Sequence, residues 1–179
     1  MKTLETNRLI LRAWSLTDAD DFYEYAKHPE VGLNGGWPPH TSREESLKVI
    51  QYFINDADIW AIVLKKNNKV IGSVGLHADS KRPKISVREL GFVVSADYWG
   101  LGIATEASKR AIAHAFEDMG LDLVSTYHKS FNARAKRVVE KCGFTREGML
   151  RQASRRYDDL IFDAVCYSIL KSEYKYVGG

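Results

Sequence analysis

The sequence contains little cysteine and no long apolar run. Its 179 residues include two cysteines, Cys142 and Cys166, which are too few for a disulfide scaffold and form no metal-ligand spacing. No apolar stretch approaches the roughly 18 residues of a membrane span, and the first residues lack the apolar segment of a signal peptide. We therefore expect a cytoplasmic protein with reduced thiols and no membrane association.

An excess of charge of one sign is also missing. The net charge of +3 is too small to favour a nucleic-acid-binding module. Residues 1–80 carry 9 basic and 11 acidic side chains, whereas residues 81–179 carry 17 and 12. The second half therefore attracts a small polyanion better than the first half does, although a chance imbalance on solvated faces explains the counts equally well.

The chain lacks repeats, low-complexity segments and Pro/Gly-rich linkers, so we expect a single domain over residues 1–179. Apolar alternation and β-branched runs predict strands over residues 8–14, 60–65, 69–76, 86–94, 121–127 and 161–170, the last paired with a short strand at 155–157. Helical spacing and capping residues predict helices that begin near Thr17, Ser42, Thr105 and Ala133. Glycine and proline predict a loop over residues 31–40. These elements predict a mixed α+β domain with mostly antiparallel strands.

One segment, residues 98–106, places a glycine-rich turn between a strand and an amphipathic helix. Gly100, Gly102 and Ala104 let the backbone turn tightly and approach a ligand. The free N–H groups of the first helical turn and the positive end of the helix dipole would then form an anion site. The segment is neither a P-loop nor a dinucleotide fingerprint, because the Gly-Lys-Ser/Thr sequence, the third glycine and the ribose-binding acid are missing. An ordinary turn is the alternative.

The same segment resembles the pyrophosphate loop of the GNAT superfamily of acyl-CoA N-acyltransferases, whose pattern is Arg/Gln-x-x-Gly-x-Gly/Ala. Gly102 and Ala104 match this pattern, while Trp99 stands where Arg or Gln is usual. The run that begins at Tyr98 is similar to the RimJ/RimL-like branch, which includes ribosomal-protein N-terminal acetyltransferases. Further segments resemble that branch in the same order, at residues 6–12, 132–144 and 163–174.

The resemblance implies a GNAT-like twisted sheet, flanked by helices and splayed at its centre between the strands at 86–94 and 121–127. It implies that acetyl-CoA, as co-substrate, lies in this split. The cofactor-binding residues that it implies are Phe92, Val93, Val94, Leu101, Gly102, Ile103, Ala104, Thr105 and Asn132. Lys129, Arg134 and Arg137 are candidates for binding the outer phosphate, or else are solvated surface charges. The five histidines show no metal-ligand spacing and are expected in loops or at the surface, so we expect no metal.

Acetyl transfer to an amine needs a base, a polarised thioester carbonyl and a proton for the leaving thiolate. We expect Glu89 to be the base, because the superfamily often places a catalytic glutamate at this strand position; a plain ion pair with a basic neighbour is the alternative. A backbone N–H near Phe92 or Val93 would polarise the carbonyl. Val139 and Ala135 replace the tyrosine and serine that relatives use as proton donors, which leaves a water, Tyr98 or direct loss of the thiolate as substitutes.

We therefore expect an acetyl-CoA-dependent N-acetyltransferase that acts on a primary amine by direct attack on the thioester, as a monomer or homodimer. The acceptor is a protein N-terminal α-amine or a small amine such as a polyamine, amino acid or antibiotic. An open groove would favour a protein, whereas a closed acidic pocket would favour a polycation. Residues that would make such a pocket acidic are Glu30, Glu44, Glu45 and Asp79. Trp37, in the long loop, is the aromatic residue that we expect nearest the acceptor. A non-catalytic acyl-CoA-binding sensor is the rival from another class.

Overall fold

The computed structural model describes residues 1–175, and an eight-stranded sheet forms its centre. The strand order is β1-β2-β3-β4-β5-β6-β8-β7. The strands are β1 (Leu4–Glu5), β2 (Leu9–Arg12), β3 (Ile59–Leu64), β4 (Val70–Ala78), β5 (Val87–Val94), β6 (Leu123–Lys129), β7 (Thr145–Arg155) and β8 (Ile161–Leu170). Every neighbouring pair is antiparallel except β5 and β6, which are parallel. The predicted α+β, mostly antiparallel sheet is confirmed.

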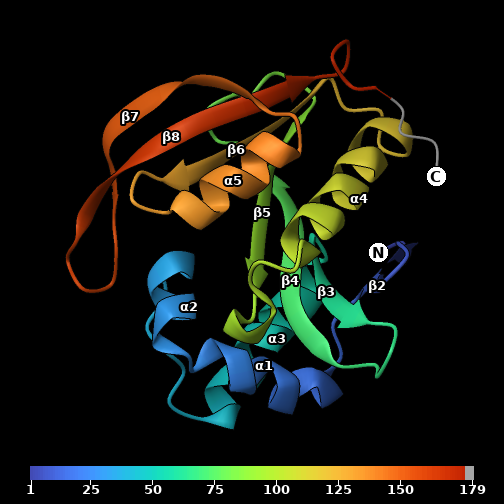
Figure 1. Cartoon of the computed structure of the whole chain (residues 1–179), viewed down its shortest axis with the longest axis vertical. Helices are drawn as coiled ribbons and strands as arrows, with labels where there is room; N and C mark the ends of the chain where they lie inside the picture. The colour runs from blue at the N-terminus through green and yellow to red at the C-terminus, as the bar shows by residue number, and fades with distance from the viewer. Residues whose placement is uncertain (176–179) are drawn as a thin grey trace.

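Five helices flank the sheet (Figure 1). They are α1 (Ala19–Ala26), α2 (Pro29–Gly35), α3 (Arg43–Asp56), α4 (Ile103–Glu117) and α5 (Ala133–Lys141), with short 3₁₀ turns at Leu16–Asp18 and Ala96–Tyr98. Figure 1 shows α1, α2 and α3 together at one end of the molecule, while α4 and α5 lie along the central strands. None of these helices, within residues 1–175, has the length and apolar character needed to cross a bilayer.

Two predictions about local structure are wrong. The predicted loop at 31–40 contains most of α2, because Pro29 is tolerated at the first helical turn and Gly36, at φ 103°, ends the helix in the left-handed region. Glycine and proline there mark helix ends. The strand that pairs with β8 is also longer than the predicted 155–157, since it begins at Thr145 and ends at Arg155.

Each face of the sheet has its own core. On one face α4 presents Ala107, Ala111 and Ala115, all fully buried, to the central strands. These small side chains let the helix lie close to the sheet. On the other face, Phe22 of α1 and Phe53 of α3 pack beside each other, with ring centroids 5.9 Å apart. The two cores fix β5 between α4 and the α1–α3 group.

The sheet splits between β5 and β6. Their pairing runs only from Val87↔Leu123 to Glu89↔Ser125. Beyond it, β5 continues against β4 as far as Val94, and β6 continues against β8 as far as Lys129. Figure 1 shows β6, β7 and β8 turned away from β3, β4 and β5. The central splay implied by the family resemblance is therefore present at the expected strands.

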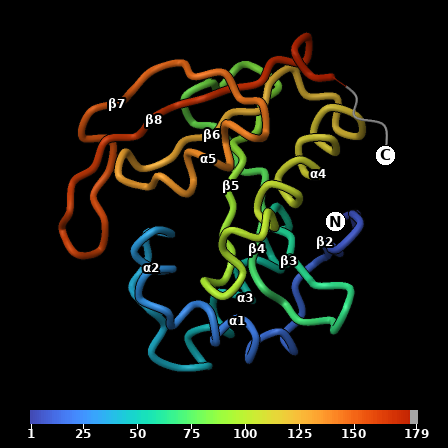
Figure 2. Tube along the Cα trace, viewed as in Figure 1, coloured from blue at the N-terminus to red at the C-terminus, as the bar shows by residue number. Residues whose placement is uncertain are grey.

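The far end of the split is bridged by α2. Lys129, at the end of β6, donates a hydrogen bond from Nζ to the carbonyl oxygen of Asn34 at 2.7 Å. Arg156, in the β7–β8 turn, donates to the carbonyl oxygen of Leu33 at 3.2 Å. Figure 2 shows this turn beside α2. Two cations therefore satisfy carbonyls at the C-terminal end of α2, where the negative end of the helix favours positive charge.

Candidate active site

A cavity of about 800 Å³ occupies the split. Alternate side chains of a strand point to opposite faces of a sheet. The cavity wall includes Glu89 and Gly91 from one face of β5, and Leu90 and Phe92 from the other face. The cavity therefore extends through the sheet, with α4 and α5 on one side and α2 and α3 on the other.

The backbone of β5 is left partly unpaired along this cavity. The Leu90 carbonyl accepts a hydrogen bond from Thr126 Oγ1 at 2.8 Å, and the Val94 carbonyl accepts one from Trp99 Nε1 at 2.9 Å. Antiparallel residues alternate in the side to which their N–H and C=O groups point. Phe92 therefore presents both groups to the split, where β6 supplies no ladder partner, whereas Val93 bonds toward β4.

The turn before α4 has the geometry of an anion site. Gly100 and Gly102 both have φ of 78°, a left-handed conformation that favours glycine. Gly102 is the N-cap and provides no side chain to the first turn. The N–H groups of Ile103, Ala104 and Thr105 consequently lack intrahelical partners. These residues and Gly102 line the cavity, whereas Leu101 does not and is 57% exposed.

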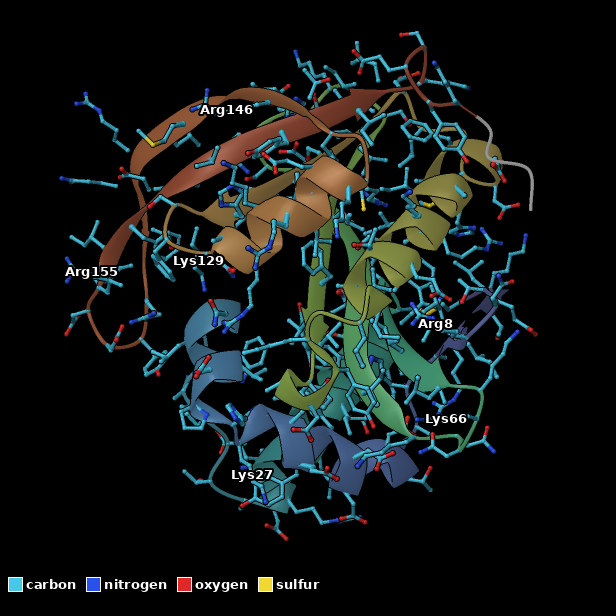
Figure 3. The ribbon with its side chains drawn as sticks, in the orientation of Figure 1. Arg8, Lys27, Lys66, Lys129, Arg146 and Arg155 are labelled. Carbon is cyan, nitrogen blue, oxygen red and sulfur yellow. The ribbon has the colours of Figure 1, made fainter. Side chains whose placement is uncertain are left out.

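A negative side chain close to this anion site is neutralised by the N-terminal segment. Glu106 accepts hydrogen bonds from Thr6 Oγ1 at 2.6 Å and from Arg8 Nε at 2.7 Å, and Arg8 NH1 also donates to the Leu101 carbonyl at 3.0 Å. Burial opposes ionisation of Glu106, but the bonds from Thr6 and Arg8 outweigh it and lower the pKa of the carboxyl group. Arg8, labelled in Figure 3, thus ties residues 100–106 to β2 while cancelling the charge of Glu106.

Trp99 brings a cation to the cavity. Its indole ring lies 4.2 Å from the guanidinium carbon of Arg134 on α5, a cation–π contact. Both residues line the cavity, as do Arg137 and Lys141 farther along α5. Of the three cations considered for the outer phosphate, Arg134 and Arg137 therefore lie along the α5 wall. Lys129 instead contacts the C-terminal end of α2 through Asn34, whereas Arg134 reaches Glu30 in the first turn of that helix.

Asn132 begins α5. Its Oδ1 accepts a hydrogen bond from the Ala135 N–H at 3.0 Å and so caps the helix. Within residues 1–175 its Nδ2 has no partner, and the residue lines the cavity. The asparagine that was predicted to contact the cofactor therefore has a structural role through one amide atom and keeps the other available.

Glu89 lies where the pairing of β5 and β6 ends. Its Oε2 accepts a hydrogen bond from Lys81 Nζ at 2.7 Å, and its side chain is 20% exposed. Within residues 1–175 Oε1 has no partner. Burial lowers the pKa of Lys81, but its bonds and charges with Glu89 and Asp79 outweigh burial and raise that pKa. The ion pair considered as an alternative is therefore present, and it leaves one carboxylate oxygen free to accept a proton.

Two further residues beside Glu89 were missed. His77 was expected in a loop or at the surface; it instead lies in β4, opposite Glu89 in the register, and lines the cavity. The predicted strand ended one residue earlier, at Leu76. Tyr127 of β6 also lines the cavity, and its pKa is raised by burial and by the charge of Glu89. The alternation of β6 was the only sequence signal for Tyr127.

The two positions at which relatives carry a tyrosine or serine hydroxyl group lie in different environments. Val139 is buried in the core beside α4, and Ala135 lines the cavity. Tyr98, one of the substitute proton donors, also lines the cavity. Cys142, whose Sγ lies 3.9 Å from the Thr105 carbonyl oxygen, has a pKa raised to about 12 by burial. The thiol is therefore unsuited to act as a nucleophile.

The cavity wall is not acidic. Glu89 is its one acidic residue among residues 1–175. Asp79 instead binds Arg82 and Ser125, each at 2.8 Å, and Glu30 pairs with Arg134 at the surface. Glu44 and Glu45 lie in the first turn of α3, outside the wall. The four acids that would have made the acceptor pocket suitable for a polycation do not line it.

Comparison with known proteins identifies the family. Residues 8–145 match the model described as the acetyltransferase (GNAT) domain. The uncharacterized N-acetyltransferase p20 of Bacillus licheniformis is 31% identical over 97% of this chain and 99% of its own length.

Two solved structures share the fold. An acetyltransferase of the GNAT family from Bacillus anthracis has a TM-score of 0.87 at 22% identity, over 96% of this chain and 100% of that one. The ribosomal-protein-S5-alanine acetyltransferase from Vibrio fischeri has a TM-score of 0.76 at 19% identity, over 98% and 100%. With its split sheet and the open first turn of α4, this chain belongs to the GNAT family of acetyl-CoA-dependent N-acetyltransferases.

Proposed function

We propose that the protein acetylates a small primary amine in the cavity of the β5–β6 split, with Glu89 as the base. The observation that carries the proposal is the end of β-pairing at Glu89 and Ser125. At that point the carboxylate of one sheet face meets a cavity that continues to the first turn of α4. Donor and acceptor can therefore approach each other from opposite faces of the sheet.

The unpaired backbone groups support acetyl-CoA as the donor. Buried backbone N–H and C=O groups are nearly always hydrogen-bonded. The unpaired N–H and C=O groups of Phe92 are therefore suited to a ligand that carries amide groups, as the pantetheine arm does. The first-turn N–H groups of α4 suit the pyrophosphate, and Asn132 Nδ2 suits a carbonyl. Acetyl-CoA supplies the activated acetyl thioester, and the chain holds it beside the acceptor, an effect worth about 7–11 kcal/mol in well-oriented reactions.

Glu89 has the chemistry of a general base. Oε1 is free to take a proton from the acceptor amine, directly or through water, while Lys81 fixes the other oxygen. The Phe92 N–H, which points to the split, is placed to polarise the thioester carbonyl. Tyr98 and Tyr127, both in the wall, are hydroxyl groups from which the leaving thiolate can receive a proton.

The junction of α2 with β6 and the β7–β8 turn supports a small acceptor. Lys129 and Arg156 bind the last carbonyls of α2 and so join α2 to β6 and to the β7–β8 turn. A protein N-terminus, the other acceptor considered, would have to enter past this junction. A polyamine is disfavoured because Glu89 is the one acidic residue in the wall among residues 1–175, and Lys129 adds a buried positive charge to the same cavity.

The test is release of CoA thiol from acetyl-CoA across a panel of amines, with wild type, Glu89→Gln and the control Glu147→Gln. Glu147 is another ion-paired carboxylate, bonded to Arg82, but it does not line the cavity. We expect Glu89→Gln to lower kcat/KM by about 10²–10⁴-fold, the usual contribution of a general base, and to leave acetyl-CoA affinity unchanged. Glu147→Gln should retain activity.

Two results would contradict the proposal. Equal activity of wild type and Glu89→Gln would remove the glutamate from the chemistry. Tight acetyl-CoA binding with no acetylation of any amine would instead identify a non-catalytic acyl-CoA sensor.

A further inference from the structure

Lys129 is a buried cation without an acidic partner. The residue is 7% exposed and lines the same cavity as Glu89. Figure 3 shows it in the region between β8, α5 and α2. No carboxylate of residues 1–175 forms an ion pair with its ammonium group. A buried charge is strongly destabilising unless it is paired, so the missing partner requires an explanation.

The protein compensates this charge only in part. Nζ donates one hydrogen bond, to the Asn34 carbonyl, and lies 5.4 Å from the centroid of the Phe162 ring. An ammonium group has three donors, so two remain. Burial, and after it the positive charge of Arg156, lowers the pKa of Lys129 to about 8. The side chain is consequently still protonated in most molecules at neutral pH.

The neighbouring charges do not supply the missing anion. Arg156 donates to both carboxylate oxygens of Asp158, at 2.7 and 2.6 Å, so these two charges cancel each other. Lys129 therefore leaves a net positive charge at the α2 end of the cavity.

A second unsatisfied donor lies nearby. Trp37 Nε1 is buried without a hydrogen-bond partner within residues 1–175, and Trp37 lines the cavity. Its ring packs on Gly35, and Lys129 Nζ lies 2.9 Å from the position that a Cβ on the adjacent Gly36 would occupy. Lys129 Nζ and the six-membered ring of Trp37 therefore both border the C-terminal end of α2. Buried N–H donors without acceptors are rare and point to a ligand that is absent from the protein alone.

We propose that Lys129, together with the N–H of Trp37, binds a carboxylate group of the acceptor, so that the substrate is an amine that also carries a carboxylate. This inference rests on the proposed function, because it assigns the second charge of the same acceptor. Free amino acids and peptides with an acidic first residue share this chemistry.

The strand geometry fits such an acceptor. Ser125, opposite Glu89, and Lys129 are four residues apart on β6, so they point to the same face, about 13 Å apart along the strand. The side chains of Lys129 and Glu89 both line the cavity between these two strand positions.

A purely structural role is the competing explanation. Lys129 would then only cap α2 through Asn34, and its loss would affect all acceptors alike. The variant Lys129→Gln separates the two, because the amide can still donate to the Asn34 carbonyl but carries no charge. Trp37→Phe provides an independent variant, since it keeps the ring and removes only the N–H.

The experiment measures kcat/KM by thiol release for free amino acids and for their α-carboxamides. A second arm compares C-terminally amidated peptides that begin with Asp or with Asn, to distinguish the two sources of the carboxylate. We expect at least one carboxylate to exceed its matched amide by about tenfold or more, as for a hydrogen bond to a charged group. Lys129→Gln should abolish this preference while changing the amide rates less than about threefold.

Three outcomes overturn the inference. Amides that react as well as their acids remove the carboxylate site. If Lys129→Gln lowers kcat/KM equally for acids and for amides, the lysine has only a structural role. If that variant is unstable, the acid-to-amide ratio of kcat/KM in wild type and in Trp37→Phe tests the inference instead. Bound acetyl-CoA with no amine acetylated in any arm refutes the proposed function, and this inference with it.

Discussion

The ion pair of Arg8 and Glu106 makes a quantitative prediction about acetyl-CoA binding. Glu106 stands in the first turn of α4, where its charge would repel a pyrophosphate, and Arg8 cancels it across 2.6 Å. Replacing Arg8 with Ala removes the cancellation. We therefore expect Arg8→Ala to weaken acetyl-CoA binding, and Arg8→Ala combined with Glu106→Gln to restore it.

Coulomb's law gives the expected size of the effect. The Arg8 side chain is 49% exposed and that of Glu106 is 21% exposed, so solvent screens the interaction considerably. At a separation of about 8 Å and an effective dielectric constant of about 40, each phosphate charge feels about 1 kcal/mol of repulsion. Two phosphate charges then give about 2 kcal/mol, which corresponds to a roughly tenfold to thirtyfold increase in Kd.

Isothermal titration calorimetry with acetyl-CoA, at low salt and at about 0.5 M NaCl, measures this effect directly. Because the repulsion is electrostatic, the increase in Kd should shrink to a few-fold at high salt. A double variant that binds as weakly as Arg8→Ala would refute the reasoning. It would assign the loss to the hydrogen bond between Arg8 and the Leu101 carbonyl, and hence to the position of the turn.

Three further predictions concern single residues. Gly102→Ala and Gly120→Ala force alanine to φ of 78° and 67°, so each should lower the free energy of unfolding in urea by about 1–2 kcal/mol. Only Gly102→Ala should also weaken acetyl-CoA binding, and equal acetyl-CoA affinities of the two variants would contradict the anion site. The pKa of Lys129, about 8, lies below its unfolded value, so the unfolded chain binds more protons between about pH 8 and 10.5 and stability rises with pH there. Relative to Lys129→Met, wild type should gain on the order of 2–3 kcal/mol from pH 7 to 10.5, and a constant difference in urea unfolding would disprove the linkage. Cys142, with a pKa of about 12, should react with iodoacetamide at pH 8 roughly 10³-fold more slowly than an unperturbed thiol; rapid labelling located by mass spectrometry would show that the side chain is accessible.

The parts of the fold that could be predicted from sequence are those with a local cause. The amphipathic period of α4 and the apolar run of β5 each follow from side chains within one element. The seven residues of α2 could not be found in this way. Their helix depends on Pro29 at its start and on bonds from Lys129 and Arg156, about a hundred residues away in the chain, at its end. Such contacts leave no periodic signal.

The candidate site divides along the same line. The glycine turn at Gly102 was predictable because backbone conformation and position before a helix are local properties. The pairing of Glu89 with Lys81, and the place of His77 beside it, depend on how β4, β5 and the loop after β4 meet. The sequence offers Lys129 only as one of three candidates for the outer phosphate, or else as a solvated charge, because charge alone does not tell which end of a split sheet a strand residue reaches.

The charges of the cavity also bear on the acceptor itself. An amine must lose its proton before it can attack a thioester. The buried Lys129 disfavours a second, unpaired positive charge in the cavity. Glu89 opposes this effect but is itself paired with Lys81. A carboxylate held by Lys129 would let the acceptor bind without relying on its ammonium charge, so that the bound amine can give its proton to Glu89 Oε1.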